Sequence, residues 1–288
     1  MEKPVDNTNP LKSFYRQPQI YIKLPSEGRW YNESVIESST NGEYPVYSMT
    51  STDEMKFKIP DALMNGQATV DVVQSCMPAI KDAWKLINYD IDTILIAIRI
   101  ATYGESMDVT AGVPGTNIEQ NHSIGLPALL DQIRSNKLSD EVQLDSGLKV
   151  KASPLTYKQM TDAQLKTFEQ QRVYTQVTES QLSVEEKTKR FTDSFHQLRA
   201  LNTELLINNI SEITMPDGNR VTDKNHIKEF IDNADAKLIK DLEEKLSEIR
   251  SQGSIKPFTV KATEEHIKAG APVTYQVPIT FDNANFFV

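Results

Sequence analysis

The feature that most restricts the fold is a long stretch of helical periodicity in residues 156–210. Apolar side chains recur there three or four residues apart, which places them along one face of a helix. Ser183 is followed three residues later by Glu186, the pattern of a capping box, so a second helix is predicted to begin there. The apolar stripe fits packing within the chain, although two helices this polar could also project and offer a groove to a partner.

The N-terminal half mixes short strands with helices. Residues 19–24 alternate apolar and polar side chains, and residues 44–49 form a second short strand-like segment. These two segments are expected to pair as a hairpin with a long loop. Helix starts are predicted at Thr50 or Thr52, at Pro60 and near Gly66, and a short helical turn is predicted at residues 78–80.

The most apolar run, residues 91–101, is the best core candidate of this half. Asp90 stands where it could cap a buried helix that ends at Gly104. The run is rich in β-branched side chains, so a strand is the alternative.

Strand-like alternation returns on both sides of the helical middle. Glycines and a proline divide residues 107–127 into short alternating segments, which predicts a hairpin-rich β module. A further hairpin is predicted over residues 142–150, and the tail from residue 255 is β-like again. Between these segments, a turn is predicted at residues 216–219, followed by helices over residues 223–231 and 235–250.

Together these patterns predict an α+β fold with a mixed N-terminal half, a helical middle, and a small ribbon-like β module formed by segments before and after the helices. Four units are predicted: an N-terminal arm with a β-hairpin (1–48), a helical core (49–106), the ribbon-like module (107–155 and 254–288) and a helical domain (156–253).

Composition excludes several classes of function. With 40 acidic against 31 basic side chains the net charge is -9, which disfavours binding to nucleic acid phosphates. The most apolar run carries Asp92 and Arg99 and is far shorter than the ~20 residues that span a bilayer, so no membrane insertion is expected. Residues 1–12 are predicted to be a flexible polar lead-in without the pattern of a signal peptide.

Residue types that carry chemistry are present but scattered. His122, His196, His226 and His266 lie far apart in sequence, without the spacing of a metal site or a catalytic triad. Cys76, the single cysteine, lies on an apolar helix face and is expected to be a small buried hydrophobic residue rather than a nucleophile. We therefore predict no catalytic residue, no cofactor and no metal.

Aromatic side chains gather before the first predicted helix and suggest an interface. Such a cluster either packs an N-terminal arm onto its own body or docks the arm on another subunit, because aromatic residues commonly anchor interfaces. The group consists of Phe14, Tyr15, Tyr21, Trp30 and Tyr31.

Several segments together resemble the baseplate hub subunit family of T-even-like contractile phages. The resemblance is dense over residues 11–108 and thins afterwards. It rests on Leu11-Lys12-Ser13-Phe14-Tyr15-Arg16, Ile20-Tyr21-Ile22-Lys23-Leu24-Pro25-Ser26, Val46-Tyr47-Ser48-Met49-Thr50, Pro60-Asp61-Ala62-Leu63-Met64-Asn65-Gly66, Ser75-Cys76-Met77-Pro78, Ile98-Arg99-Ile100-Ala101-Thr102-Tyr103-Gly104, Glu229-Phe230-Ile231-Asp232-Asn233 and Phe281-Asp282-Asn283-Ala284-Asn285-Phe286-Phe287.

The chain departs from this family at one feature. Many similar proteins carry a zinc ribbon with two cysteine pairs, but residues 112–115 and 269–273 of this chain hold no cysteine. If the ribbon persists here, its two sequence-distant halves must meet by packing rather than through a structural metal.

The resemblance implies a structural component of a phage tail baseplate, in the hub region, that acts through protein–protein contacts. Implied partners are other baseplate subunits and tail tube or spike subunits, in multiple copies of a symmetric assembly built in the bacterial host cytoplasm. Two alternatives are a transient hub assembly chaperone that is absent from the mature virion and, from another class, a tail-associated hydrolase. The expected contact residues are Phe14, Tyr15, Tyr21, Trp30, Phe286 and Phe287.

Overall fold

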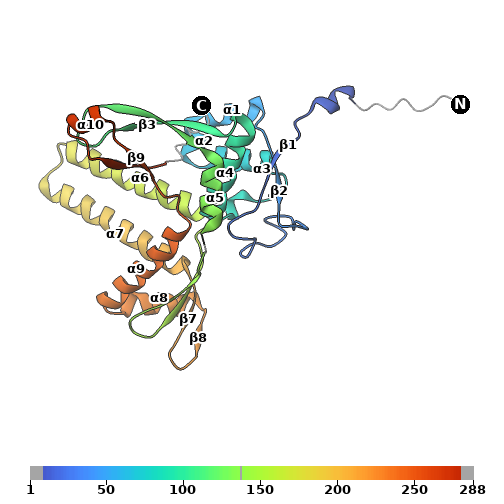
Figure 1. Ribbon diagram of the computed structural model, residues 1–288. Helices are drawn as coiled ribbons and strands as arrows, with labels where there is room; N and C mark the ends of the chain where they lie inside the picture. The colour runs from blue at the N-terminus through green and yellow to red at the C-terminus, as the bar shows by residue number, and fades with distance from the viewer. Residues whose placement is uncertain (1–8, 137, 280–288) are drawn as a thin grey trace.

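The computed structural model describes residues 9–136 and 138–279 (Figure 1). The fold is α+β, as predicted, with helices and small antiparallel sheets of two or four strands. Most of the predicted lead-in lies outside the described residues. The elements gather around three clusters of buried apolar side chains.

The first and largest cluster belongs to the N-terminal half. Strands β1 (Pro18–Ile22) and β2 (Tyr44–Tyr47) form the predicted antiparallel pair. Helices α1 (Ser51–Phe57), α2 (Pro60–Met64) and α3 (Gln67–Cys76) follow, and a short 3-10 turn, η2 (Ala83–Lys85), leads to α4 (Asn88–Tyr103). Thr50 caps α1 through a capping box with Asp53, so this start is set by local sequence.

Helix α4 is the centre of this cluster, and the strand alternative for its apolar run is wrong. Ile94, Ile96 and Ile98 are fully buried although they point to different sides of the helix. A helix that is apolar all round must be covered on every side. The expected cap at Asp90 is also wrong: the residue before the helix is Ile87, and Asp90 lies in the first turn.

The third and smallest cluster joins two hairpins that are far apart in sequence. Strands β3 (Ser106–Gly112) and β4 (Glu119–Gly125) form one, and β9 (Phe258–Lys261) and β10 (Thr274–Val277) form the other. A short helix not predicted, α10 (Glu264–Lys268), connects β9 to β10. Val113 packs here against Tyr275 and Val277, so the segments before and after the helical middle meet by packing, as predicted.

The second cluster lies beneath a four-stranded sheet with the order β5-β6-β7-β8. The strands are β5 (Glu141–Gln143), β6 (Lys149–Ala152), β7 (Ile210–Thr214) and β8 (Arg220–Val221). Helices α8 (Lys224–Asn233) and α9 (Ala236–Gln252) cover the second cluster. Asp223 caps the start of α8, and Asp235 caps the start of α9. Helix α5 (Leu126–Ser135), which was not predicted, packs on the first cluster.

The helical middle is an antiparallel pair, α6 (Tyr157–Glu179) and α7 (Val184–Asn208), that projects to one side of the body (Figure 1). Capping boxes begin both helices, at Thr156 and at Ser183. The four-stranded sheet combines strands from two of the predicted units, because β6 pairs with β7. The boundaries of the four units stay a prediction.

Candidate protein interface

Arg16 fixes the point at which the N-terminal segment leaves the body. Its Nη1 donates to the carbonyl oxygen of Ser48 at 2.7 Å, and its Nη2 donates to the carbonyl oxygen and Oγ of Ser75 at 2.6 and 3.0 Å. Nη1 also lies 3.4 Å from the buried carboxylate of Asp53. Burial alone would raise the pKa of Asp53, but hydrogen bonds from Thr50 and Ser75, together with the guanidinium charge, hold it below its ordinary value.

Residues 9–15, which we call the arm, precede this anchor and extend away from the body (Figure 1). They contain a short 3-10 turn, η1 (Pro10–Phe14), none of whose side chains is buried. Phe14 is 84% exposed and Tyr15 is 54% exposed, and Leu11 is also exposed. These exposed apolar side chains make the arm a candidate contact surface.

Tyr21 and Trp30 lie on the body, separate from the arm. Tyr21 is 61% exposed on the outer side of β1, whose next residue, Ile22, faces the core. Trp30 lies in the loop between β1 and β2, where it is half-buried. The predicted contact residues therefore form more than one surface, and Phe286 and Phe287 lie outside the described residues.

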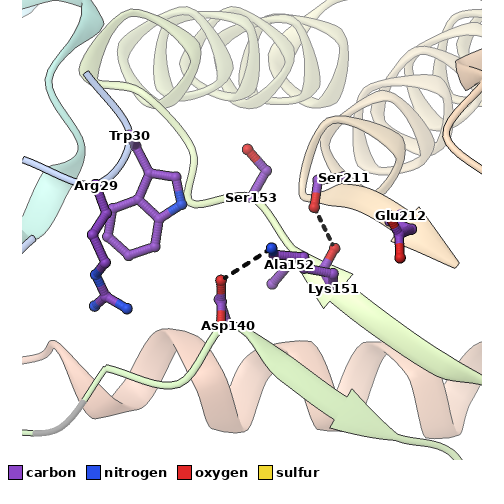
Figure 2. A pocket seen from close by; sticks show the side chains of 8 residues that line it. All are labelled: Arg29, Trp30, Asp140, Lys151, Ala152, Ser153, Ser211 and Glu212. Atoms are coloured by element: carbon purple, nitrogen blue, oxygen red, sulfur yellow. Dashed lines mark hydrogen bonds and ion pairs between the residues drawn. The ribbon is translucent and has the colours of Figure 1, made fainter. Parts of the chain in front are cut away.

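Trp30 lines a pocket of about 580 Å³ between this loop and the four-stranded sheet (Figure 2). The guanidinium of Arg29 stacks 4.7 Å from the centre of the indole ring. Across the pocket, the backbone is held by hydrogen bonds from Ala152 N to the carbonyl oxygen of Asp140 (2.6 Å) and from Ser211 Oγ to the carbonyl oxygen of Lys151 (2.9 Å). The pocket thus has a rigid floor and one aromatic wall.

A buried polar network positions the loop that carries Trp30. The carboxylate of Asp90 accepts hydrogen bonds from the backbone N–H of Ser26 at 3.0 Å and from the hydroxyl of Tyr31 at 2.5 Å. The Tyr31 hydroxyl in turn accepts from the backbone N–H of Ile87 at 2.9 Å. Burial raises the pKa of Asp90 to about 6, although these hydrogen bonds oppose the rise. The network ties the loop to the start of α4.

The chain was compared with known protein families, with curated proteins and with solved structures. The family model described as T4 bacteriophage base plate protein matches residues 17–269. The chain belongs to this family. No curated protein and no solved structure gives a significant match.

Membership makes the chain a structural base plate component, with a place in the phage tail and contacts to other tail components. The match begins next to the anchor Arg16, so the arm lies outside the matched range. The family match therefore carries no information about what the arm contacts.

Within the described part of this base plate protein, reactive groups do not converge. No group of three or more His, Cys, Asp and Glu side chains in that part could hold a metal ion. Cys76 is buried, as predicted, and burial raises the pKa of its thiol to about 12. His122 lies 3.4 Å from the hydroxyl of Tyr275, where it helps to join the two hairpins.

A separate finding concerns membranes. Among the described residues, no helix has both the length and the apolar character that crossing a membrane requires.

Sequence reasoning missed the anchor and the buried network of this base plate protein. Arg16 reaches backbone groups that lie 32 and 59 residues further along the chain, and Ser26 bonds to a carboxylate 64 residues away. No local pattern signals such contacts. The exposed aromatic residues of the arm, in contrast, were visible in the sequence itself.

Proposed function

We propose that this base plate protein works in the hub region of the baseplate, where it joins neighbouring subunits through protein–protein contacts. Its partners are other baseplate subunits and tail tube or spike subunits, in a symmetric assembly with several copies of the chain, built in the host cytoplasm. Family membership supports the structural role. The single observation that carries the proposal is an apolar arm held outside a firmly anchored body.

The arm is suited to docking for two physical reasons. First, Phe14 and Tyr15 offer large aromatic surfaces that are already exposed, and residues of this kind dominate binding energy when a partner covers them. Second, Arg16 fixes the base of the arm, so docking orders only a short segment and loses less conformational entropy.

Tyr21 and Trp30 are proposed as secondary contact points. The indole N–H of Trp30 has no hydrogen-bond partner that the structure describes, so it is free to donate to a partner at the edge of the pocket. Phe286 and Phe287 are proposed contacts at the other end of the chain on the basis of the sequence alone.

The test is deletion of residues 9–15 with Arg16 retained. Because no side chain of η1 is buried, the remaining chain should keep its circular dichroism spectrum and its unfolding midpoint within the usual error. Phage carrying the deletion should fail to assemble complete baseplates, as counted by electron microscopy of lysates. A matched control is Val184→Ser, which changes an exposed apolar residue at the tip of α7.

Normal baseplates in the deletion strain would contradict the proposal. Quantitative mass spectrometry of purified wild-type particles supplies the second measurement. A structural subunit is present in stoichiometric amounts, whereas its absence from the particles would replace the structural role with that of a transient assembly chaperone.

A further inference from the structure

A second candidate surface, a groove between three helices, lies on the opposite side of the molecule from the arm. Helices α7, α8 and α9 enclose a groove of about 660 Å³, which is within the range of sites that bind ligands or peptide side chains. Leu198, Leu206 and Ile239 line it as half-buried side chains, and Ile231 is buried at its base. Phe195 stands at its margin and is 67% exposed. We call this the α7–α9 groove.

The arm and the α7–α9 groove are complementary in character. The groove combines apolar side chains with polar and charged ones, and its volume has room for an aromatic anchor, which is a common mode of recognition in grooves. The arm offers Phe14 and Leu11 on a short, fixed segment. Figure 1 places the arm beside β1 and helices α7, α8 and α9 at the far side of the body, so the anchored arm points away from the helices that line the groove of its own chain.

Charge favours a second copy of the chain as the occupant. The arm carries Lys12 and no acidic residue, so the rest of the chain holds 30 basic and 40 acidic side chains, a net charge of -10. A basic segment on an acidic molecule is attracted to the body of another copy.

One pair of charges fits this arrangement in detail. Lys12 on the arm and Glu243 at the margin of the α7–α9 groove both lack an ion-pair partner in the described part of the chain. Of the other charges in the lining, Lys240 lies 3.7 Å from Glu244 and Asp232 contacts Lys228, whereas Arg199 has no ion pair among the described residues. An arm that enters the groove can therefore bring Lys12 to an available carboxylate.

We propose that the arm of one copy docks in the α7–α9 groove of a second copy, with Phe14 as the apolar anchor and Lys12 beside Glu243. The proposal rests on the docking role of the arm proposed above and names its partner. Because arm and groove are different surfaces, the contact is head-to-tail, and repetition of it builds a ring or an open chain of copies.

Cysteine cross-linking of the full-length protein tests the pairing directly. Two differently tagged variants are mixed under mild oxidation, one with Ser13→Cys in the arm and the other with Ala236→Cys, an exposed residue of the groove. Cys76 is buried and is the chain's only native cysteine, so the background is low. We expect a disulfide-linked product that contains both tags and is lost when the arm variant also carries Phe14→Ala.

The matched control replaces Ala236→Cys by Val184→Cys, which is exposed on the same pair of long helices but outside the groove. Sedimentation velocity of the unmodified chain supplies a second readout. Self-association should be detectable and should weaken by at least about tenfold in Phe14→Ala and in Phe195→Ser, because each removes apolar contact area. Equal cross-linking to both positions, or a monomer at about 100 µM, would overturn the proposal.

The experiments distinguish failure of the self-docking proposal from failure of the assembly role proposed for the arm. If the isolated chain stays monomeric while deletion of the arm still blocks baseplate assembly, the arm docks on another protein and only the self-docking proposal is lost. If the cross-link forms but phage lacking the arm assemble normally, the self-docking contact stands and the assembly role is lost.

Discussion

The carboxyl group of Asp90 shows how a single buried residue links folding to pH. It is enclosed in the first core cluster, where Ser26 and Tyr31 donate hydrogen bonds to it. Burial raises its pKa to about 6, above the value of about 4 that an aspartate has in an unfolded chain. The folded state thus binds this proton more tightly, so the stabilising contribution is complete in acid and is lost as the pH rises from about 4 through about 6.

Asp90→Asn tests this linkage. The amide can still accept from Ser26 N–H and can donate to the hydroxyl of Tyr31, but it does not titrate. The unfolding free energy of the wild type relative to the variant should fall by about 3 kcal/mol between pH 4 and pH 7, since one pKa unit corresponds to about 1.4 kcal/mol. Burial also raises the pKa of Asp92, to about 7, but that residue is present in both proteins and cancels in the difference.

Urea denaturation at several pH values gives the measurement. Thr110→Ser, at an exposed position on β3 that does not titrate, is the control and should leave the pH profile of the wild type unchanged. A pH-independent difference between the wild type and Asp90→Asn would show that the carboxyl has the same pKa in the folded and the unfolded chain.

At the scale of elements, the join between the two β-hairpins depends on a close approach of two glycines. Gly115 follows β3 and Gly270 precedes β10, and both have positive φ, +77° and +108°. A Cβ atom on Gly115 would lie 2.7 Å from the carbonyl oxygen of Gly270, closer than any packing tolerates. Direct backbone contact therefore brings the two segments together.

Gly115→Ala should therefore destabilise this β module more than its backbone conformation alone explains. An alanine in the left-handed region costs about 1–2 kcal/mol, and the contact with Gly270 adds to that cost. Gly42→Ala is a matched control, because Gly42 has nearly the same φ, +74°, with no atom within 4 Å of an added Cβ. Amide hydrogen exchange should show faster opening of β9 and β10 in Gly115→Ala and not in Gly42→Ala. Equal effects of the two substitutions would remove the close contact as the cause.

Elements whose signals are local were predictable from the sequence. The capping box at Ser183 and the turn at residues 216–219 were expected and are present, and the helix start predicted at Thr50 or Thr52 lies at Thr50, because each depends on residues within four positions of one another. Helix α5 was missed, although its apolar residues Leu126, Leu129 and Ile133 have helical spacing.

Elements and contacts that depend on distant partners could not be predicted. Strand β6 pairs with β7 across about sixty residues, and the α7–α9 groove exists only because α8 and α9 fold back beneath α7. Of the candidate site, the aromatic residues of the arm were named from the sequence as expected contacts, and their contact role stays a prediction. Its anchor at Arg16 was not, because the bonded atoms belong to residues that have no sequence relation to it.

The arm lies at one side of the molecule, and helices α7, α8 and α9, which line the groove, lie at the other (Figure 1). An arm and a groove on opposite sides are typical of subunits that assemble head-to-tail, because an arm with a fixed base cannot reach the groove of its own copy. Growth of such a contact into a ring or a filament depends on the angle between successive copies. A symmetric baseplate requires the ring.

Two opposing electrostatic effects act between copies of the chain, and salt weakens them to different extents. Two bodies of charge -9 repel each other, whereas Lys12 and Glu243 attract across the proposed contact. At about 0.1 M salt the Debye length is ~10 Å, so repulsion between whole bodies is largely screened and the short-range pair persists.

Lys12→Glu should therefore weaken self-association, and the loss should shrink as salt rises to about 0.5 M. Lys149→Glu makes the same change in net charge on β6, outside the arm and the groove, and should have a smaller effect at every salt concentration. Sedimentation velocity of the three proteins across this range gives the comparison. Equal losses for both substitutions would mean that net charge alone, and no specific contact of Lys12, governs how copies meet.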